Sequence, residues 1–144
     1  MLRTIVNPYR PVFFNDNSGV LPVRLVKMNN DGSFIYQRLV FYSTLDSGAS
    51  WKLAPGGLNA AQYIQVQIVS PRDIFVLCGS SLCASQDGAQ TWSTVNPDVA
   101  FAEGFSGMDF VSPTTGFVIT SDASGAHGLY KTTDGGATWN ALGR

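Results

Sequence analysis

Three aspartates of the sequence recur inside one short motif, in the segments 44–51, 85–92 and 132–139. In each segment a hydroxyl residue precedes the Asp by two positions, and a second hydroxyl residue and a Trp close the segment. Repeated carboxylates raise the question of calcium, but a calcium loop needs several oxygen ligands that converge at short spacing. We therefore expect no metal site and interpret each Asp as the acceptor that caps a tight turn. The residues expected to fasten these turns are Thr44, Asp46, Gly48 and Trp51; Ser85, Asp87 and Trp92; and Thr132, Asp134, Gly136 and Trp139.

Other residues with catalytic potential are scattered along the chain. Glu103, the only Glu, would have to pair with a loop acid such as Asp98 to act as a glycosidase, and we interpret both as solvated loop acids. His127, the only His, stands in a predicted loop, and the chain has no GxSxG motif to mark a nucleophilic Ser. We expect no enzyme activity, no catalytic residue and no cofactor. A sialidase binds the carboxylate of its substrate through a cluster of arginines. The arginines of this chain do not match such a motif; they are at positions 3, 10, 24, 38, 72 and 144.

The two cysteines, Cys78 and Cys83, are separated by four residues that we predict to form a hairpin turn. Cysteines on either side of such a turn can come close enough for a disulfide, which would favour an oxidising compartment. The alternative is a pair of small buried thiols in neighbouring strands. A zinc site is not expected, because no further Cys or His lies near to complete four ligands.

The spacing of the motifs indicates the elements that position them. Successive motif aspartates are 41 residues apart (46 to 87) and 47 apart (87 to 134), close to the 40–50 residues of a four-stranded propeller blade. A second repeat supports this, since 110–119 matches 68–77 at an offset of 42. The sequence therefore predicts an all-β fold of about three four-stranded antiparallel blades of a β-propeller, in units 10–54, 62–96 and 106–142.

Each unit is expected to contain four strands, with the motif turn between the third and the fourth. The expected strands are 11–14, 20–27, 35–43 and 51–53; 64–69, 74–78, 82–85 and 92–95; and 108–111, 117–121, 129–132 and 139–142. Ala89 replaces the motif Gly in the second unit, so that turn is expected to avoid positive φ there or to shift by one residue. Six aromatic residues are expected to pack between blades; the alternative is that they line a sugar- or protein-binding face. They are Tyr9, Phe13, Phe14, Tyr36, Tyr42 and Tyr63.

Composition and charge exclude several partner classes. The net charge of −1 argues against nucleic acid, which requires a basic face. No apolar run approaches the roughly 20 residues of a transmembrane helix. The N-terminus lacks the apolar stretch of a signal peptide, so the chain is cytosolic, has lost a leader or is a piece of a longer protein. Charged residues make up only 13% of the chain, which favours a covered surface or a secreted protein rich in neutral polar residues.

The motifs at 44–51, 85–92 and 132–139 resemble the Asp-box, or BNR repeat, of a β-propeller family that includes sialidases and sortilin-type receptors. The unit 108–142 is most similar in style to propellers of the photosystem II assembly-factor type. This resemblance implies that the boxes lie on the propeller rim, away from the ligand-binding centre.

Three blades are too few to close a ring of the usual four to eight. We therefore expect a protein partner or a second copy to complete the ring, or a fragment of a longer chain. The expected function is a non-catalytic scaffold for protein assembly, outside the cytoplasm, in the periplasm or secreted. The alternatives are a fragment of a carbohydrate-active propeller, sialidase-like or another glycoside hydrolase, which leaves carbohydrate as a candidate ligand, and a structural subunit of a large complex.

Overall fold

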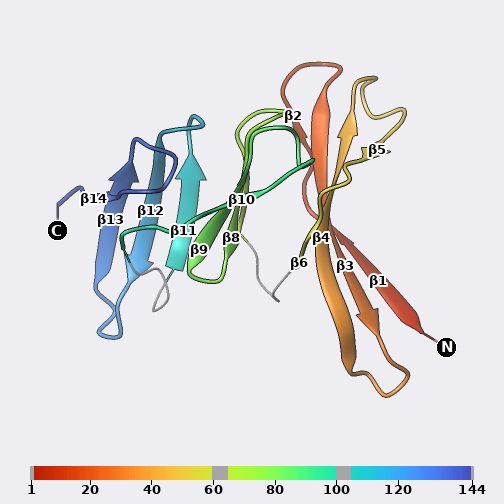
Figure 1. Cartoon of the computed structure of the whole chain (residues 1–144), viewed down its shortest axis with the longest axis horizontal. Coiled ribbons are helices and arrows are strands. Elements are labelled where there is room, and N and C mark those ends of the chain that lie inside the picture. The colour runs from red at the N-terminus through yellow and green to blue at the C-terminus, as the bar shows by residue number, and fades with distance from the viewer. Residues whose placement is uncertain (1, 60–64, 100–104, 144) are drawn as a thin grey trace.

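The computed structural model describes residues 2–59, 65–99 and 105–143, and these form three antiparallel β-sheets that follow one another along the chain. The sheets stand side by side, with the N-terminal sheet at one end and the C-terminal sheet at the other (Figure 1). This all-β arrangement agrees with the fold class that the sequence predicts. We call the sheets blades 1, 2 and 3 in chain order.

Every blade contains the four predicted strands, and blade 1 contains two more. Blade 1 is formed by β1 (Arg3–Pro8), β2 (Val12–Phe13), β3 (Gly19–Met28), β4 (Phe34–Thr44), β5 (Lys52–Leu53) and β6 (Leu58–Asn59). Blade 2 is formed by β7 (Val66–Ile68), β8 (Ile74–Cys78), β9 (Ser81–Ser85) and β10 (Ser93–Val95). Blade 3 is formed by β11 (Phe105–Phe110), β12 (Gly116–Ser121), β13 (His127–Thr132) and β14 (Asn140–Ala141).

Blades 2 and 3 are simple meanders, in which each strand pairs with the next one along the chain. In blade 1, β1 and β2 both pair with β3, and β5 and β6 both pair with β4. The strands β1 and β6 were not expected, because neither has a counterpart in the other two units. β1 finds a partner only because β3 continues well past the point where β2 pairs with it.

The hairpin of β3 and β4 is the longest in the structure. Its strands contain 10 and 11 residues, whereas the equivalent strands of blade 2 contain 5 each. β1 pairs with its outer half, from Arg3 opposite Met28 to Pro8 opposite Val23. The hairpin therefore extends beyond the other two blades at one end of the molecule (Figure 1).

Two apolar clusters hold the blades together. Alternation along each strand sends successive side chains to opposite faces of the sheet, so each inner face can meet the next blade. The cluster between blades 1 and 2 contains Val20, Leu39, Phe41, Ile74, Val76, Cys83 and Ala89. The cluster between blades 2 and 3 contains Phe75, Leu82, Ala84, Met108, Phe110, Val118 and Trp139.

Backbone hydrogen bonds also link each blade to the turn motif of the next. The N–H of Gly56 donates to the carbonyl of Ala89 at 3.0 Å, and the N–H of Asp98 donates to the carbonyl of Ala137 at 3.2 Å. Gly56 lies between β5 and β6 of blade 1 and Asp98 follows β10 of blade 2, and each acceptor lies in the box of the following blade. The boxes of blades 2 and 3 are therefore placed at the contacts between blades.

Candidate functional site

The Asp-box at 132–139 is a closed network of hydrogen bonds within one turn. The buried hydroxyl of Thr132 donates to the carboxylate of Asp134 at 2.8 Å and accepts from the N–H of Gly136 at 2.9 Å. The same carboxylate accepts from the N–H of Thr138 at 2.9 Å and from its hydroxyl at 2.6 Å. Asp134 thus ties the two ends of the turn together.

The other two boxes repeat this network. Asp46 accepts from the hydroxyl of Thr44 at 2.7 Å and from the hydroxyl of Ser50 at 2.5 Å. Asp87 accepts from the hydroxyl of Ser85 at 2.8 Å and from the N–H of Thr91 at 2.9 Å. Since the same bonds form in all three copies, the motif residues act as fasteners of the turns.

The box aspartates are strongly acidic. Hydrogen bonds from the hydroxyl and then the N–H of the residue four positions later lower the pKa of Asp46, Asp87 and Asp134 to about 2. A bonded hydroxyl or N–H stabilises the ionised carboxylate, so the proton is lost at lower pH. At neutral pH these groups carry no proton to donate, and their oxygens are already occupied by the turn.

The prediction that Ala89 avoids positive φ was wrong. Ala89 has a φ of 64° and is fully buried, and its N–H donates to the hydroxyl of Ser85 at 2.9 Å. The equivalent residue Gly136 has a φ of 97° and forms the equivalent bond. The hydrogen bond and the burial of one methyl group in the cluster between blades 1 and 2 offset the strain of a left-handed alanine.

The box tryptophans differ in what they contact. The indole N–H of Trp139 donates to the carbonyl of Gly136 within its own box at 2.8 Å. That of Trp92 donates to the carbonyl of Gly56, between β5 and β6 of blade 1, at 3.4 Å, and its ring lies 5.3 Å from that of Phe41. Trp92 therefore links blade 1 to blade 2.

Cys78 and Cys83 form a disulfide, with their Cα atoms 5.9 Å apart. Cys78 ends β8 and Cys83 lies within β9, so the bond crosses the hairpin that the sequence predicts between them. Among the described residues no cysteine is free. The bond closes the turn at Gly79 and Ser80.

The isolated acids and the histidine do not converge. Asp98 accepts the backbone N–H of Trp139 at 2.9 Å, so it has a structural contact where a solvated acid was expected. His127 is exposed at the start of β13, opposite Ser121. Glu103 lies outside the described residues. In the described part of the chain, no three His, Cys, Asp or Glu side chains are grouped so as to hold a metal ion.

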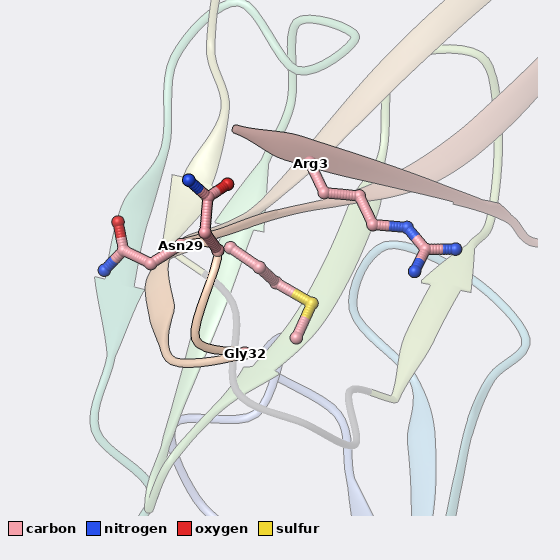
Figure 2. Close-up of a pocket in the computed structure, with 5 residues that line it drawn as sticks. Arg3, Asn29 and Gly32 are labelled. Atoms are coloured by element: carbon pink, nitrogen blue, oxygen red, sulfur yellow. The ribbon is translucent and has the colours of Figure 1, made fainter. Parts of the chain in front are cut away.

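The described arginines are also dispersed. The guanidinium of Arg24 binds the side-chain carbonyl of Gln37 on β4 at 2.7 Å, and Arg72 donates to the carbonyl of Gln86 at 3.2 Å. Arg3 lies at a shallow hollow of about 210 Å³ beside the β3–β4 turn. Figure 2 shows its side chain directed away from Asn29. No carboxylate-binding arginine cluster forms among these side chains.

The aromatic residues divide into two groups. Tyr9 and Phe14 pack against the cluster between blades 1 and 2, as interblade packing predicts. Phe13 and Tyr36, in contrast, are 45% and 46% exposed. Tyr42 is half-buried, and Tyr63 lies outside the described residues.

An exposed apolar segment lies near the tip of the long hairpin. Phe34, Ile35 and Tyr36 are consecutive on β4 and are 58%, 44% and 46% exposed. We call these three residues the hairpin patch. Of these three residues only Tyr36 was predicted as a candidate for a binding face, although three consecutive large apolar residues beside a polar turn are a signal for such a patch. Tyr36 also has the ammonium of Lys27 at 5.8 Å from its ring.

The fold matches solved structures. No family model and no curated protein matches the sequence. A structure of YCF48 bound to D1 peptide matches with a TM-score of 0.55 and 17% identity, over 98% of this chain and 42% of that one. YCF48 from Cyanidioschyzon merolae matches with a TM-score of 0.51 and 21% identity, over 85% of this chain and 33% of that one. The fold is similar to part of YCF48.

The likeness to YCF48 concerns the fold, because identity is below a quarter in both comparisons. This chain spans less than half the length of either YCF48 structure. The match agrees with the prediction of a propeller segment. The described part of the chain contains no helix that is long and apolar enough to cross a membrane.

Proposed function

We propose that this chain is a non-catalytic propeller segment that binds a protein partner through the hairpin patch. The observation that carries the proposal is the exposure of Phe34, Ile35 and Tyr36 on a hairpin that extends beyond the neighbouring blades. Contiguous exposed apolar side chains on a soluble surface are typical of interaction sites. The pairing of β3 with β4 places Phe34 opposite Met28 and Tyr36 opposite Lys27, with a shift of register at Ile35 between them.

The pairing of β4 within the described residues indicates the form of the partner. β5 pairs with β4 at Tyr42 and Ser43, and β6 pairs with it at Arg38 and Leu39. Beyond them, no described strand pairs with the outer edge of β4 from Phe34 to Gln37. An extended peptide can add as a further strand at such an edge, with backbone hydrogen bonds supplying affinity and alternate side chains supplying specificity. One of the similar YCF48 structures is bound to D1 peptide, which supports an extended peptide as the partner here.

The distribution of charged groups supports a function without catalysis. The box carboxylates are held in their turns, and Asp98 is bonded to a backbone N–H. A glycosidase would need two carboxylates that face one substrate, with one of them able to donate a proton. A pKa of about 2 makes each box Asp unsuitable as that donor.

The disulfide supports a location outside the cytoplasm. Disulfides persist in the periplasm and in secreted proteins, whereas cytosolic thiols are kept reduced. The bond between Cys78 and Cys83 closes a turn between paired strands. We therefore propose that the protein works in an oxidising compartment.

Selection from a displayed library of random peptides tests the binding site. We expect enriched peptides to bind the chain, and the double variant Phe34→Ser/Tyr36→Ser to lose at least about tenfold in affinity, since buried aromatic residues dominate interface energies. Leu45→Ser is the matched control, because Leu45 is an exposed apolar residue of β4's own box turn and lies at the opposite end of the strand. Its affinity should equal that of the unchanged chain.

Two results would overturn this proposal. The first is peptide binding that survives in the Phe34→Ser/Tyr36→Ser variant. The second is clear and specific binding on a glycan array, which would favour the carbohydrate-active alternative.

A further inference from the structure

Blades 2 and 3 contact each other through stacked aromatic rings and a close approach of a glycine to a leucine. Phe110 of blade 3 stacks on Phe75 of blade 2, with ring centroids 3.9 Å apart and an interplanar angle of 8°. Trp139 meets the edge of Phe110 at 6.1 Å and 81°, and both phenylalanines are 5% exposed. Gly136 faces Leu82 so closely that a Cβ there would lie 2.5 Å from the leucine methyl.

Blade 1 carries the same arrangement on the face that points away from blade 2. In β-sheet register, Phe13 is opposite Gly19, as Phe110 is opposite Gly116 in blade 3. Trp51 meets the edge of Phe13 at 6.1 Å and 76°, which matches the pair in blade 3. We call Phe13, Gly19, Gly48 and Trp51 the outer face of blade 1.

No neighbouring blade covers this outer face in the described structure. Phe13 is 45% exposed where its equivalent Phe110 is 5% exposed. The atoms nearest to a Cβ on Gly48 would belong to Trp51 and Phe13 of the same blade, at 3.5 Å and beyond, whereas the equivalent Gly136 meets a leucine of another blade. The outer face of blade 1 therefore has the same arrangement as the face of blade 3 that packs on blade 2, but no aromatic ring of another blade stacks on Phe13.

The side of blade 3 that points away from blade 2 carries the residues equivalent to those with which blade 2 contacts blade 3. Phe117 of blade 3 is equivalent to Phe75 of blade 2. In the register, Phe117 pairs with Asp109 on one side and Lys131 on the other. Phe75 pairs in the same way with Gln67 and Ala84. The outer face of blade 3 consists of Phe117, Ile119, Leu129 and Lys131. Leu129 is 40% exposed, whereas its equivalent in blade 2, Leu82, is fully buried under blade 3.

We propose that a second copy of this chain joins these two faces, so that Phe13 of one copy stacks on Phe117 of the other as Phe110 stacks on Phe75. The proposed contact between two copies would repeat the contact that blades 2 and 3 already form within one chain. Two such joints, related by a two-fold axis, would close a ring of six blades, within the four to eight that propellers use. The side chain of Lys131, whose ammonium now lies 5.9 Å from the Phe117 ring, has to move aside on docking.

This inference names a partner for the proposed scaffold at a surface separate from the hairpin patch. Phe13 lies on β2 and Phe117 on β12, whereas the peptide would bind the edge of β4. Loss of self-association would therefore leave peptide binding intact, and loss of peptide binding would leave the mass of the particle unchanged. The two proposals can fail independently.

The test is the solution mass of the 144-residue chain, measured by sedimentation equilibrium. We expect twice the 15.5 kDa of one chain. Phe13→Asp and Phe117→Asp should each weaken association by at least about 30-fold, as expected for a central aromatic contact. Ile119→Asp provides a second variant on the outer face of blade 3, and Leu45→Asp, on neither face, should remain dimeric. Thermal unfolding of each variant establishes that it is folded.

Mixing the two Asp variants gives a sharper result. In a mixed pair, Phe13 of the Phe117→Asp chain can still meet Phe117 of the Phe13→Asp chain, so one of the two joints is intact. The mixture should associate more tightly than either variant alone. A monomeric unchanged chain would overturn the proposal, and so would a dimer that persists in both variants. A monomer would instead favour further blades of a longer protein as the occupant of these faces.

Discussion

The carboxylate of Asp98 accepts a hydrogen bond from the backbone N–H of Trp139 at 2.9 Å, although the two residues lie 41 positions apart. Asp98 belongs to the segment that leaves blade 2, and Trp139 closes the box of blade 3. The bond therefore fixes one blade against the next at the point where the chain crosses between them. Its neighbour, the bond from the N–H of Asp98 to the carbonyl of Ala137, strengthens the same crossing.

Replacement of Asp98 tests that link. We expect Asp98→Ala to lower the free energy of unfolding by about 1–2 kcal/mol, because the partly buried N–H of Trp139 loses a charged acceptor. Asp98→Asn retains a carbonyl oxygen at the same place and should lose less than half as much. Urea denaturation followed by tryptophan fluorescence measures both. Equal losses in the two variants would mean that the hydrogen bond is not the cause.

Two glycines at the same box position provide a measure of the contact between blades. Gly136→Ala combines a φ of 97° with a Cβ that would lie 2.5 Å from a methyl of buried Leu82, so we expect a loss of about 2–4 kcal/mol. Gly48→Ala is made in the Phe117→Asp chain, which should be monomeric; there Gly48 has a φ of 87° and no blade in front of it, so strain alone should cost about 1 kcal/mol. Thermal or urea unfolding of the two variants gives the difference. A larger loss at Gly48 would contradict the assignment of the outer face of blade 1.

The box aspartates predict a defined acid transition. Their pKa values fall from 3.8 to about 2 on folding, so the folded state binds fewer protons than the unfolded state between these values. The stability that they contribute is complete above pH 4 and is lost as the pH falls from about 4 to about 2. Unfolding measured across this range should show the decrease.

A single hydroxyl can be tested within this acid transition. Thr138→Val removes the largest contribution to the low pKa of Asp134, so that pKa should rise towards 3.8. Carboxyl chemical shifts followed by NMR against pH report the change directly. Thr133→Val is the matched control, because Thr133 is an exposed neighbour of Asp134 and contributes nothing to its low pKa. An unchanged Asp134 titration in the Thr138→Val variant would contradict the assigned cause.

Reduction of the disulfide should have a modest effect on stability. The bond joins residues only five positions apart, so it removes little freedom from the unfolded chain, and we expect a loss of about 2 kcal/mol. The double variant Cys78→Ser/Cys83→Ser should unfold at the same urea concentration with or without reductant, whereas the unchanged chain should shift on reduction. Thiol alkylation of the native protein without reductant should modify neither cysteine. Ready alkylation would argue against the proposed oxidising compartment.

The repeat in the sequence was sufficient to predict the blades because its signals are local. Asp46, Asp87 and Asp134 each form their turns with residues no more than four positions away, so the motif carries its own geometry. Strand order and the inner faces then follow from alternation between turns. The strand β1 lacked such a signal, since its pairing depends on the unusual length of β3.

The errors at individual residues have physical causes of the same kind. A left-handed alanine is unfavourable in isolation, and at Ala89 a buried methyl and the bond to Ser85 reverse that preference. Phe13 has the sequence environment of a core residue, and it is exposed because no described blade stands in front of it. The hairpin patch was missed except for Tyr36, because periodicity does not reveal how far a hairpin extends beyond its neighbours.

The short reach of the hydrogen bonds in each Asp-box bears on how the chain folds. Contacts between residues four positions apart close within microseconds, long before strands from different blades can meet. Each box can therefore set the register of its two strands at an early stage, independently of the other two. The slow step is then the docking of preformed hairpins, so the order in which the blades assemble need not follow their order in the chain.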